Sequence, residues 1–456
     1  MADLDSIFKA YDVRGIYPDQ LDAAVARSIG ASFVEVMRRE DPDVSSVVVG
    51  RDMRPSGVEL VGAFVDGVLS RGADVVDIGL ASTDMLYFAS GSLGVPGAVF
   101  TASHNPAQYN GIKMCRAGAA PIGEDSGLGD IKELVRSGFG SEAASGAAGS
   151  RGSVVERDML ADFADHVRSF IDVTKLRPLK VVADTANGMG GLVVPAVFES
   201  LPFDLEILYP ELDGTFPNHP ADPIDLANLA DLRARVLETG ADLGLAFDGD
   251  ADRVFLVDEL AQPISGSLTT AIVASGLLDK DPGASVIHNL ICSKVVPEVV
   301  AEKGGTPIRS RVGHSFIKAL MAESDAIFGG EHSGHYYFKE NFRADSGLIA
   351  ALVILEQLST AGTTLSELCE PFRRYAASGE INTTVDDQQA VIDRVAAHYG
   401  DAQQDHLDGL TVDSGDWWFN LRASNTEPLL RLNLEAADDA AVEARVAEVT
   451  QVMTSY

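Results

Sequence analysis

Strand-like and helix-like segments alternate along this 456-residue sequence, and the alternation constrains its fold more than any other feature. Apolar runs typical of buried strands occupy residues 44–50, 73–79 and 97–101. Helix-like segments at residues 57–70 and 83–92 separate them. Because parallel strands need crossover connections of this kind, the sequence predicts an α/β unit built on parallel strands.

The same alternation returns twice before the pattern changes. Further strands are indicated at residues 179–184, 204–209, 241–247, 284–290 and 326–329, with a helix at 225–239. From about residue 371 the order becomes strand, helix, two strands around a loop and a closing helix. That order is typical of an α+β domain.

We therefore expect three similar α/β domains followed by one α+β domain. The chain is too long for a single core, so several domains are expected on length alone. The expected domains are residues 1–150, 151–256, 257–368 and 369–456. A stretch rich in Gly, Ser and Ala at residues 138–153 is predicted to be a linker or an exposed loop.

The charge of the chain excludes two classes of partner. The sequence has 68 acidic and 35 basic residues, which gives a formal net charge of −33. Such a surface repels nucleic acid and anionic membranes, so neither is an expected partner. It would also repel a phosphorylated substrate, so any phosphate site must concentrate cations locally.

Other features favour a cytoplasmic protein, for which either a monomer or a homodimer is expected. Three cysteines, Cys115, Cys292 and Cys369, lie far apart without metal-type spacing and are predicted to be reduced thiols. The first five residues are Met-Ala-Asp-Leu-Asp and lack the basic-then-apolar pattern of a signal peptide. The longest apolar run, residues 348–355, is much too short to span a bilayer.

The first of four polar loops is Thr101-Ala-Ser-His-Asn-Pro106. It follows the predicted strand at 97–101, and its Asn and Pro are typical of a turn that ends a strand. We expect this turn to hold the hydroxyl of Ser103 exposed at the end of the strand, as a fold presents a nucleophile. An ordinary turn serine is the alternative that the motif alone does not exclude.

The second loop is Asp248-Gly-Asp-Ala-Asp-Arg253, between two apolar runs. Three carboxylates at alternate positions can converge on one hard cation. A helix-loop-helix calcium site is the rival interpretation, but Arg253 stands where such a loop needs glycine, and the flanks are strand-like. Mg²⁺, which keeps few protein ligands and works beside phosphate oxygens, suits the loop better.

The third loop is Gly330-Glu-His-Ser-Gly-His335. It does not match the Gly-x-Ser-x-Gly elbow of serine hydrolases or the His-Glu-x-x-His zinc helix. A carboxylate, a hydroxyl and imidazoles on a glycine-rich turn suit hydrogen bonds to a polyol. A polar loop without a special role is the alternative.

The fourth loop is Arg422-Ala-Ser-Asn-Thr-Glu-Pro428, and Arg431 follows soon after. Hydroxyls, an amide, exposed backbone N–H groups and two arginines favour an anion site. A capped turn is the alternative. A phosphatase needs only a nucleophile and a metal, so a second anion site suits a substrate that keeps one phosphate bound while the other is transferred.

Together, these four loops resemble those of the α-D-phosphohexomutase superfamily, in the same order and over nearly the whole chain. The start, Phe8-Lys-Ala-Tyr-Asp-Val-Arg-Gly15, is similar to the phosphomannomutase/phosphoglucomutase branch. The phosphoglucosamine mutase branch usually reads Thr-Asp-Gly-Ile-Arg-Gly there, so Tyr11 and Asp12 argue against it. The resemblance implies three α/β domains with mixed sheets and a C-terminal α+β domain around a central cleft.

The resemblance also implies the chemistry. Phosphorylated Ser103 would give its phosphoryl group to a hexose phosphate of mannose or glucose, through a hexose 1,6-bisphosphate that reorients before it returns a phosphoryl group. Mg²⁺ would be held by a phosphoserine oxygen and by Asp248, Asp250 and Asp252. The residues implied around the transferred group are Arg14 and Arg253, with Lys113 and His335 at positions proposed for acid–base work.

The implied substrate-binding residues are more widely spread. Glu331 and Ser333 would read the 3- and 4-hydroxyls of the sugar, and Tyr11 and His314 would line the cleft. The residues implied for the substrate phosphate are Arg422, Ser424, Asn425, Thr426 and Arg431. A lysine of the third domain in some relatives is absent near Leu290-Ile-Cys-Ser-Lys294, and Lys294 is the candidate to replace it.

Three alternatives stay open. The chain could be a phosphoglucosamine mutase, or a phosphoserine phosphatase or phosphotransferase on the same scaffold. It could also be a non-catalytic acidic calcium-binding protein, against which Arg253 in place of glycine argues.

Overall fold

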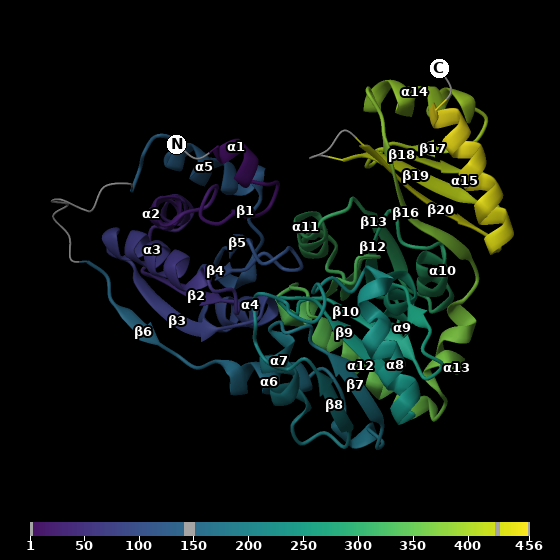
Figure 1. Ribbon diagram of the computed structural model, residues 1–456, viewed down its shortest axis with the longest axis horizontal. Helices are drawn as coiled ribbons and strands as arrows, with labels where there is room; N and C mark the ends of the chain where they lie inside the picture. Colours follow the sequence, from purple (N-terminus) through teal and green to yellow (C-terminus); the bar gives the residue numbers. More distant parts are fainter. Residues whose placement is uncertain (1–2, 141–150, 425–428, 455–456) are drawn as a thin grey trace. The chain divides into compact units, whose positions relative to one another are not determined.

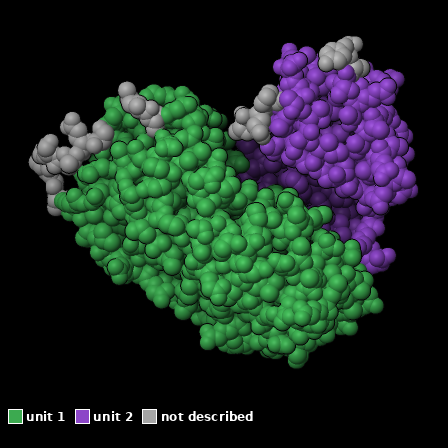
Figure 2. Space-filling view, viewed as in Figure 1, with its two compact units in different colours: residues 1–264, 333–367 green, residues 265–332, 368–456 purple. Residues whose placement is uncertain are grey.

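A computed structural model describes residues 3–140, 151–424 and 429–454 of the chain. Its elements are labelled in Figure 1. The chain divides into two compact units, coloured separately in Figure 2. Unit 1 comprises residues 1–264 and 333–367, and unit 2 comprises residues 265–332 and 368–456.

The first sheet of unit 1 has six strands in the order β1-β5-β4-β2-β3-β6. These strands are β1 (Val13–Ile16), β2 (Ser46–Arg51), β3 (Asp74–Leu80), β4 (Gly97–Phe100), β5 (Tyr109–Cys115) and β6 (Val154–Glu156). The predicted parallel strands are confirmed as β2, β3 and β4. Strands β1 and β5 pair in antiparallel fashion, so the sheet is mixed.

Helices cover this sheet and close its core. They are α1 (Leu4–Ile7), α2 (Ala23–Glu40), α3 (Gly57–Ser70), α4 (Thr83–Leu93) and α5 (Leu128–Arg136). Helices α2 and α3 approach closely through glycine, since a Cβ atom on Gly67 would lie 2.1 Å from the carbonyl oxygen of Arg27. Strand β6 follows residues 141–150, which lie outside the described residues, and pairs with β3.

The second sheet of unit 1 has five strands in the order β11-β10-β9-β7-β8. They are β7 (Lys180–Asp184), β8 (Asp204–Leu208), β9 (Leu243–Phe247), β10 (Val254–Asp258) and β11 (Pro263–Ile264). Strand β7 is parallel to β8 and β9, whereas β10 returns antiparallel to β9. This hairpin carries the acidic loop at its turn.

The remaining elements of unit 1 are α6 (Leu160–Arg168), α7 (Gly190–Phe198), α8 (Ala230–Thr239), β15 (Tyr336–Phe338) and α12 (Gly347–Ala361). The predicted helix at 225–239 is divided, because a short 3₁₀ turn, Leu226–Leu229, precedes α8. Within the described residues, no single helix has the length and apolarity to cross a membrane. Helix α12 and residues 365–372 pass such a test only as a pair bent by 101°.

Unit 2 contains a parallel group of strands and an antiparallel sheet. In the parallel group, β12 (Ser285–Asn289) lies between β13 (Thr306–Ser310) and β14 (Phe328–Gly330). Its helices are α9 (Gly266–Lys280), α10 (Val295–Glu302) and α11 (His314–Ser324). Helix α13 (Leu365–Cys369) contains the boundary between the units.

The antiparallel sheet has the order β16-β20-β19-β18-β17. Its elements are β16 (Ala376–Thr384), α14 (Gln388–His398), β17 (Gln403–Asp405), β18 (Leu410–Asp413), β19 (Trp418–Ala423), β20 (Leu429–Ala436) and α15 (Asp439–Thr454). Strands β17 and β18 were not expected, because they are short and β17 is wholly polar. The expected class, three α/β regions and one α+β region, is confirmed.

Candidate active site

Ser103 follows β4 in a turn with left-handed backbone, at φ 47°. Its main-chain N–H donates to the hydroxyl of Thr101 at 2.9 Å. The expectation of an exposed hydroxyl is wrong, because Ser103 is only 4% exposed. The acidic loop of the second sheet covers it so closely that a Cβ atom on Gly249 would lie 2.4 Å from the Ser103 carbonyl oxygen.

The acidic loop forms the turn between β9 and β10, with Ala251 in left-handed conformation at φ 60°. The carboxylates of Asp248, Asp250 and Asp252 are buried, and one ligand oxygen of each lies within 4.8 Å of the others. The Ser103 hydroxyl donates to Asp248 Oδ2 at 2.7 Å. The nucleophile loop and the metal loop predicted from sequence therefore meet at one point.

The donor set of this cluster fits a hard divalent cation. Asp250 Oδ1 and Asp252 Oδ1 are buried and, within the described part of the chain, accept no hydrogen bond. Buried oxygens without a donor are costly unless a cation compensates them. Carboxylate oxygens are the ligands that Mg²⁺ and Ca²⁺ take. Strands on both sides of the loop, rather than helices, argue against a helix-loop-helix calcium site.

Two cations pair with the carboxylates of the acidic loop, and a third is held beside the loop that carries Ser103. Lys113 on β5 donates to Asp250 Oδ2 at 2.7 Å and to Asp252 Oδ2 at 2.6 Å. Arg253 Nε donates to Asp248 Oδ2 at 2.8 Å, and Nη2 of the same guanidinium lies 3.2 Å from the Ser103 hydroxyl oxygen. The third cation, Arg14 on β1, is held by Asp12 at 2.6 Å and by Asn105 Oδ1 at 2.7 Å.

Burial and charge perturb the pKa values in this cluster. Burial raises the pKa of Asp248 to about 7, although the Arg253 guanidinium opposes the shift. Burial lowers the pKa of Lys113, but Asp250 and Asp252 outweigh it and hold that pKa well above its ordinary value. Lys113 is therefore an ammonium ion at neutral pH. Such shifts are typical of functional sites, where charge is concentrated away from water.

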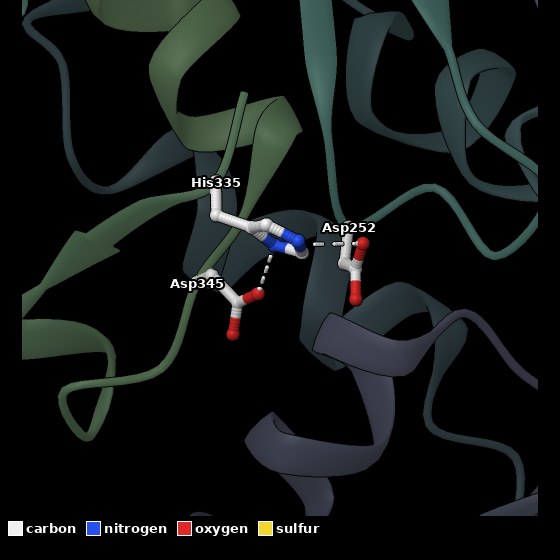
Figure 3. A group of neighbouring side chains, drawn as sticks. All are labelled: Asp252, His335 and Asp345. Atoms are coloured by element: carbon white, nitrogen blue, oxygen red, sulfur yellow. Dashed lines mark hydrogen bonds and ion pairs between the residues drawn. The ribbon is translucent and has the colours of Figure 1, made fainter. Parts of the chain in front are cut away.

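His335 lies beside the acidic loop, between two carboxylates (Figure 3). Its Nδ1 is 2.7 Å from Asp345 Oδ2 and 3.8 Å from Asp252 Oδ1. Burial lowers the pKa of His335, but the two carboxylates outweigh it and raise that pKa above its ordinary value. A carboxylate bonded to one ring nitrogen fixes the ring and leaves Nε2 as the atom that can face a substrate.

Glu331 belongs to unit 2, whereas Ser333 and His335, from the same predicted loop, belong to unit 1. Glu331 is 2% exposed, and its Oε1 accepts hydrogen bonds from Asn289 Nδ2 and from the Gly313 N–H, each at 3.2 Å. Its carboxylate thus fixes the turn that precedes His314. Ser333, His314 and Tyr11 are half-buried.

The predicted anion site lies in the antiparallel sheet of unit 2. Arg422 and Arg431 stand opposite each other on β19 and β20, and not in the loop. Both face Glu380, at 3.3 Å from Arg422 and 3.6 Å from Arg431. Ser424 is buried, and Asn425 and Thr426 lie outside the described residues. The two arginines therefore share one carboxylate on this surface.

Comparison with known proteins decides the family. Four models of the phosphoglucomutase/phosphomannomutase family match: alpha/beta/alpha domain I at residues 5–138, domain II at 161–261, domain III at 265–375 and the C-terminal domain at 380–452. A phosphomannomutase of Salmonella montevideo is 40% identical over 458 residues, which cover 98% of this chain and 99% of that protein. The chain belongs to the phosphoglucomutase/phosphomannomutase family.

Other relatives agree on the kind of enzyme. A protein of Xanthomonas campestris named for phosphohexose mutases is 40% identical over 98% of each chain. A crystal structure of a phosphoglucomutase/phosphomannomutase family protein from Burkholderia thailandensis matches with a TM-score of 0.88 at 34% identity, over 99% of this chain and 98% of that one. The chain is a phosphohexomutase, an isomerase-class phosphotransferase that acts on phosphosugars.

In this mutase, Lys294 is engaged within unit 2. Its Nζ donates to Asp413 Oδ1 at 2.8 Å and to the Gly415 carbonyl at 3.0 Å. Its main-chain N–H donates to Glu435 at 2.9 Å. The lysine therefore joins the parallel and antiparallel parts of unit 2, and it is committed to those contacts in the structure.

Several polar residues of the mutase site were missed from sequence. Asp345 contacts His335, and Thr83 donates its hydroxyl to Asp250 Oδ2 at 2.6 Å. His104 Nδ1 lies 3.2 Å from the Ser103 hydroxyl and also contacts Arg253. His104 could have been singled out from its place beside Ser103. Thr83 carries no such signal, because it is 167 residues from Asp250. Asp345 carries none either, because it is 10 residues from His335 and outside the predicted loop.

Proposed function

We propose that this mutase interconverts hexose 1-phosphate and hexose 6-phosphate, of mannose and of glucose, through a phosphoserine at Ser103. The observation that carries the proposal is the 2.7 Å hydrogen bond between the Ser103 hydroxyl and Asp248, the first residue of a three-carboxylate cluster. A serine beside a divalent-cation site is the arrangement that phosphoryl transfer needs. A hexose 1,6-bisphosphate is the proposed intermediate and activator.

Asp248, Asp250 and Asp252 would hold Mg²⁺ together with an oxygen of the phosphoserine. When bound, Mg²⁺ would supply charge that stabilises the phosphoryl group in transfer. Arg253 has its Nη2 3.2 Å from the Ser103 hydroxyl, so it can bind an oxygen of the phosphoryl group. Arg14 would do so from the side of β1.

The acid–base roles are proposed from geometry. The Lys113 ammonium bridges Asp250 and Asp252, so it is suited to donate a hydrogen bond or a proton to the oxygen that leaves. His335 is oriented by Asp345 through Nδ1, so its Nε2 would accept the proton of the attacking sugar hydroxyl. The two residues would exchange these roles between the two half-reactions.

The contacts with the substrate are also proposals. Glu331 and Ser333 would bind the 3- and 4-hydroxyls, which mannose and glucose share. Arg422 and Arg431, with Ser424, Asn425 and Thr426, would bind the phosphate that is not being transferred, in the place that Glu380 takes between the two arginines. Tyr11 and His314 would line the sugar site.

The test is incubation with mannose 1-phosphate, Mg²⁺ and a trace of hexose 1,6-bisphosphate, followed by NMR of the products. We expect mannose 6-phosphate, and glucose 6-phosphate from glucose 1-phosphate in a parallel reaction. Inorganic phosphate without an isomer would instead identify a phosphatase and contradict the proposal.

Replacing Arg422 by alanine is expected to raise KM about ten- to hundredfold and to change kcat less. The phosphate that is not being transferred is bound equally in the ground state and in the transition state. Loss of its contact with Arg422 therefore weakens substrate binding and leaves the transfer step largely unchanged. A charge-assisted hydrogen bond contributes about 1.5–3 kcal/mol. The measurement is steady-state kinetics with Arg445→Gln on α15 as the control, and an unchanged KM would place the phosphate elsewhere.

Glu331→Ala is expected to lower kcat/KM for mannose 1-phosphate and glucose 1-phosphate by similar factors, about ten- to hundredfold each. The two sugars differ only at C2, which Glu331 is not proposed to contact. Glu331→Gln is the matched variant, since its amide oxygen can still accept from Asn289 and Gly313 and keep the turn in place.

Deoxy substrates provide the control for Glu331. A 3-deoxy or 4-deoxy sugar phosphate should be poor with the wild type and lose little more with Glu331→Ala. If Glu331→Ala lost one sugar and kept the other, the residue would be reading C2, and the proposed dual specificity would be withdrawn.

A further inference from the structure

Arg54 is a completely buried arginine whose five N–H donors are all used. It follows β2 in the chain, next to the end of β4 where the serine loop begins. Its Nε donates to Asp52 Oδ2 at 3.1 Å. The other four donors bind main-chain carbonyl oxygens at 2.7 to 3.0 Å. Three of these belong to Ser103, Asn105 and Pro106 in the serine loop, residues 101–106, and the fourth belongs to Tyr109 at the start of β5.

The surroundings of Arg54 explain why an arginine is needed. The ring of Phe216 lies over the guanidinium at 5.1 Å, and a Cβ atom on Gly214 would be 2.6 Å from the Arg54 Cα. This cover comes from the second sheet's loops and keeps water from the carbonyl groups. Buried carbonyl oxygens need donors, and only a guanidinium presents five in one plane. A lysine has three donors and cannot bind all four carbonyls.

The guanidinium determines how Ser103 is presented. The Ser103 carbonyl is held by Arg54 Nη2 at 2.8 Å, and the Ser103 N–H is held by Thr101 at 2.9 Å. With both peptide groups held, the left-handed conformation at φ 47° is maintained. That conformation directs the hydroxyl to Asp248.

Arg54 also affects Arg14 through Asn105. The Asn105 carbonyl binds Arg54 Nη2 at 2.7 Å, while its side-chain Oδ1 accepts a 2.7 Å hydrogen bond from Arg14 Nη1. One buried residue therefore holds the backbone behind the nucleophile and behind a cation proposed to flank the phosphoryl group.

We propose that Arg54 is a positioning residue for phosphoryl transfer, which keeps the Ser103 hydroxyl and Arg14 in reactive geometry through the carbonyl groups of the serine loop. The inference rests on the proposed role of Ser103. All five N–H donors of Arg54 bind groups of unit 1, whereas the residues that are proposed to bind the substrate phosphate belong to unit 2. Substitution of Arg54 should therefore slow the transfer step and leave substrate binding unchanged.

The experiment compares Arg54→Lys with the wild type as the full-length enzyme. We expect kcat to fall by about 100-fold, because an ångström of misplacement at the nucleophile costs about that much. KM should stay within about twofold. Rates are divided by the amount of enzyme that can be phosphorylated, measured by intact mass, so that unfolded protein does not count. The ³¹P resonance of the phosphoserine should shift or broaden as its surroundings lose order.

Arg38→Lys is the matched control in unit 1. Arg38 also donates to two main-chain carbonyls, of Val44 at 2.9 Å and of Arg71 at 2.7 Å, but it holds no part of the site. It should lower Tm without changing kcat or the ³¹P signal. Two results would show that the positioning role is wrong. One is that Arg54→Lys lowers Tm alone, as Arg38→Lys does. The other is that Arg54→Lys raises KM and leaves kcat unchanged.

Asp52→Asn is a second variant, which decides the matter if Arg54→Lys does not fold. It keeps the guanidinium and weakens the group that orients Nε. We expect kcat to fall about three- to tenfold at constant KM, and an unchanged kcat would overturn the inference. An active Ser103→Ala would instead refute the proposed function, whatever the Arg54 variants do.

Discussion

Ser103→Ala is expected to abolish isomerisation, with kcat at least about 1,000-fold below that of the wild type. The hydroxyl is the proposed acceptor and donor of the phosphoryl group, and no other hydroxyl within the described residues is shown bonded to Asp248. Intact-mass analysis of the wild type should show a fraction of molecules with one phosphate, mapped to Ser103. The variant should show none.

The buried position of Ser103 adds a stability effect. Loss of its hydrogen bond to a carboxylate should lower the free energy of unfolding by about 1–3 kcal/mol. Ser28→Ala is the matched control, since Ser28 is also 4% exposed and donates to the Phe139 carbonyl. It should lose similar stability and keep full activity. A phosphate mapped to another residue, or an active Ser103→Ala, would refute the mechanism.

Asp250→Asn is expected to lose Mg²⁺ affinity and turnover together, each by more than about 100-fold. A phosphoserine adds nearly two negative charges beside three buried aspartates, and without a dication these groups repel. The asparagine can still accept from Thr83 and Lys113, so the loop should stay folded. Metal titration of the apoprotein measures the affinity independently of activity.

Two controls accompany the Asp250 variant. Asp258→Asn changes another completely buried aspartate of the same hairpin, whose Oδ1 accepts from the N–H groups of Leu260 and Gln262, and it should leave Mg²⁺ binding intact. Calcium, with longer ligand distances, should bind the wild type but support transfer poorly. Equal rates with both ions, or normal Mg²⁺ affinity in Asp250→Asn, would contradict the proposed metal role.

Local patterns predicted the elements that a short window of sequence controls. Helix α3 was predicted with the bounds that the structure has, and β2, β3 and β4 lie within one or two residues of the predicted strands. The spacing of apolar residues in each of these segments matches either a helix or a buried strand, and so indicates the type of element. The antiparallel strands β1 and β5 have no such signal, and they pair with each other from distant parts of the chain. The strands β17 and β18 are neighbours in the chain, but they are too short to show a periodicity.

The candidate site divides in the same way. The sequence by itself indicated Ser103, the three aspartates and Arg253, because each motif is short and its chemistry is visible in consecutive residues. It also carried the family resemblance, which the relatives confirm. The roles of these residues remain predictions, as do the sugar-binding and phosphate-binding sets.

Only the tertiary structure decided how the motifs meet. Burial of Ser103 follows from the packing of Gly249 on its carbonyl group, 146 residues away in the chain, and the orientation of His335 follows from Asp345. The hold of Arg54 on the serine loop is likewise made of carbonyl groups, which every residue has and no sequence pattern displays. The residue types of short motifs thus indicated the chemistry, whereas the geometry depended on contacts between side chains and main-chain groups that lie far apart in the sequence.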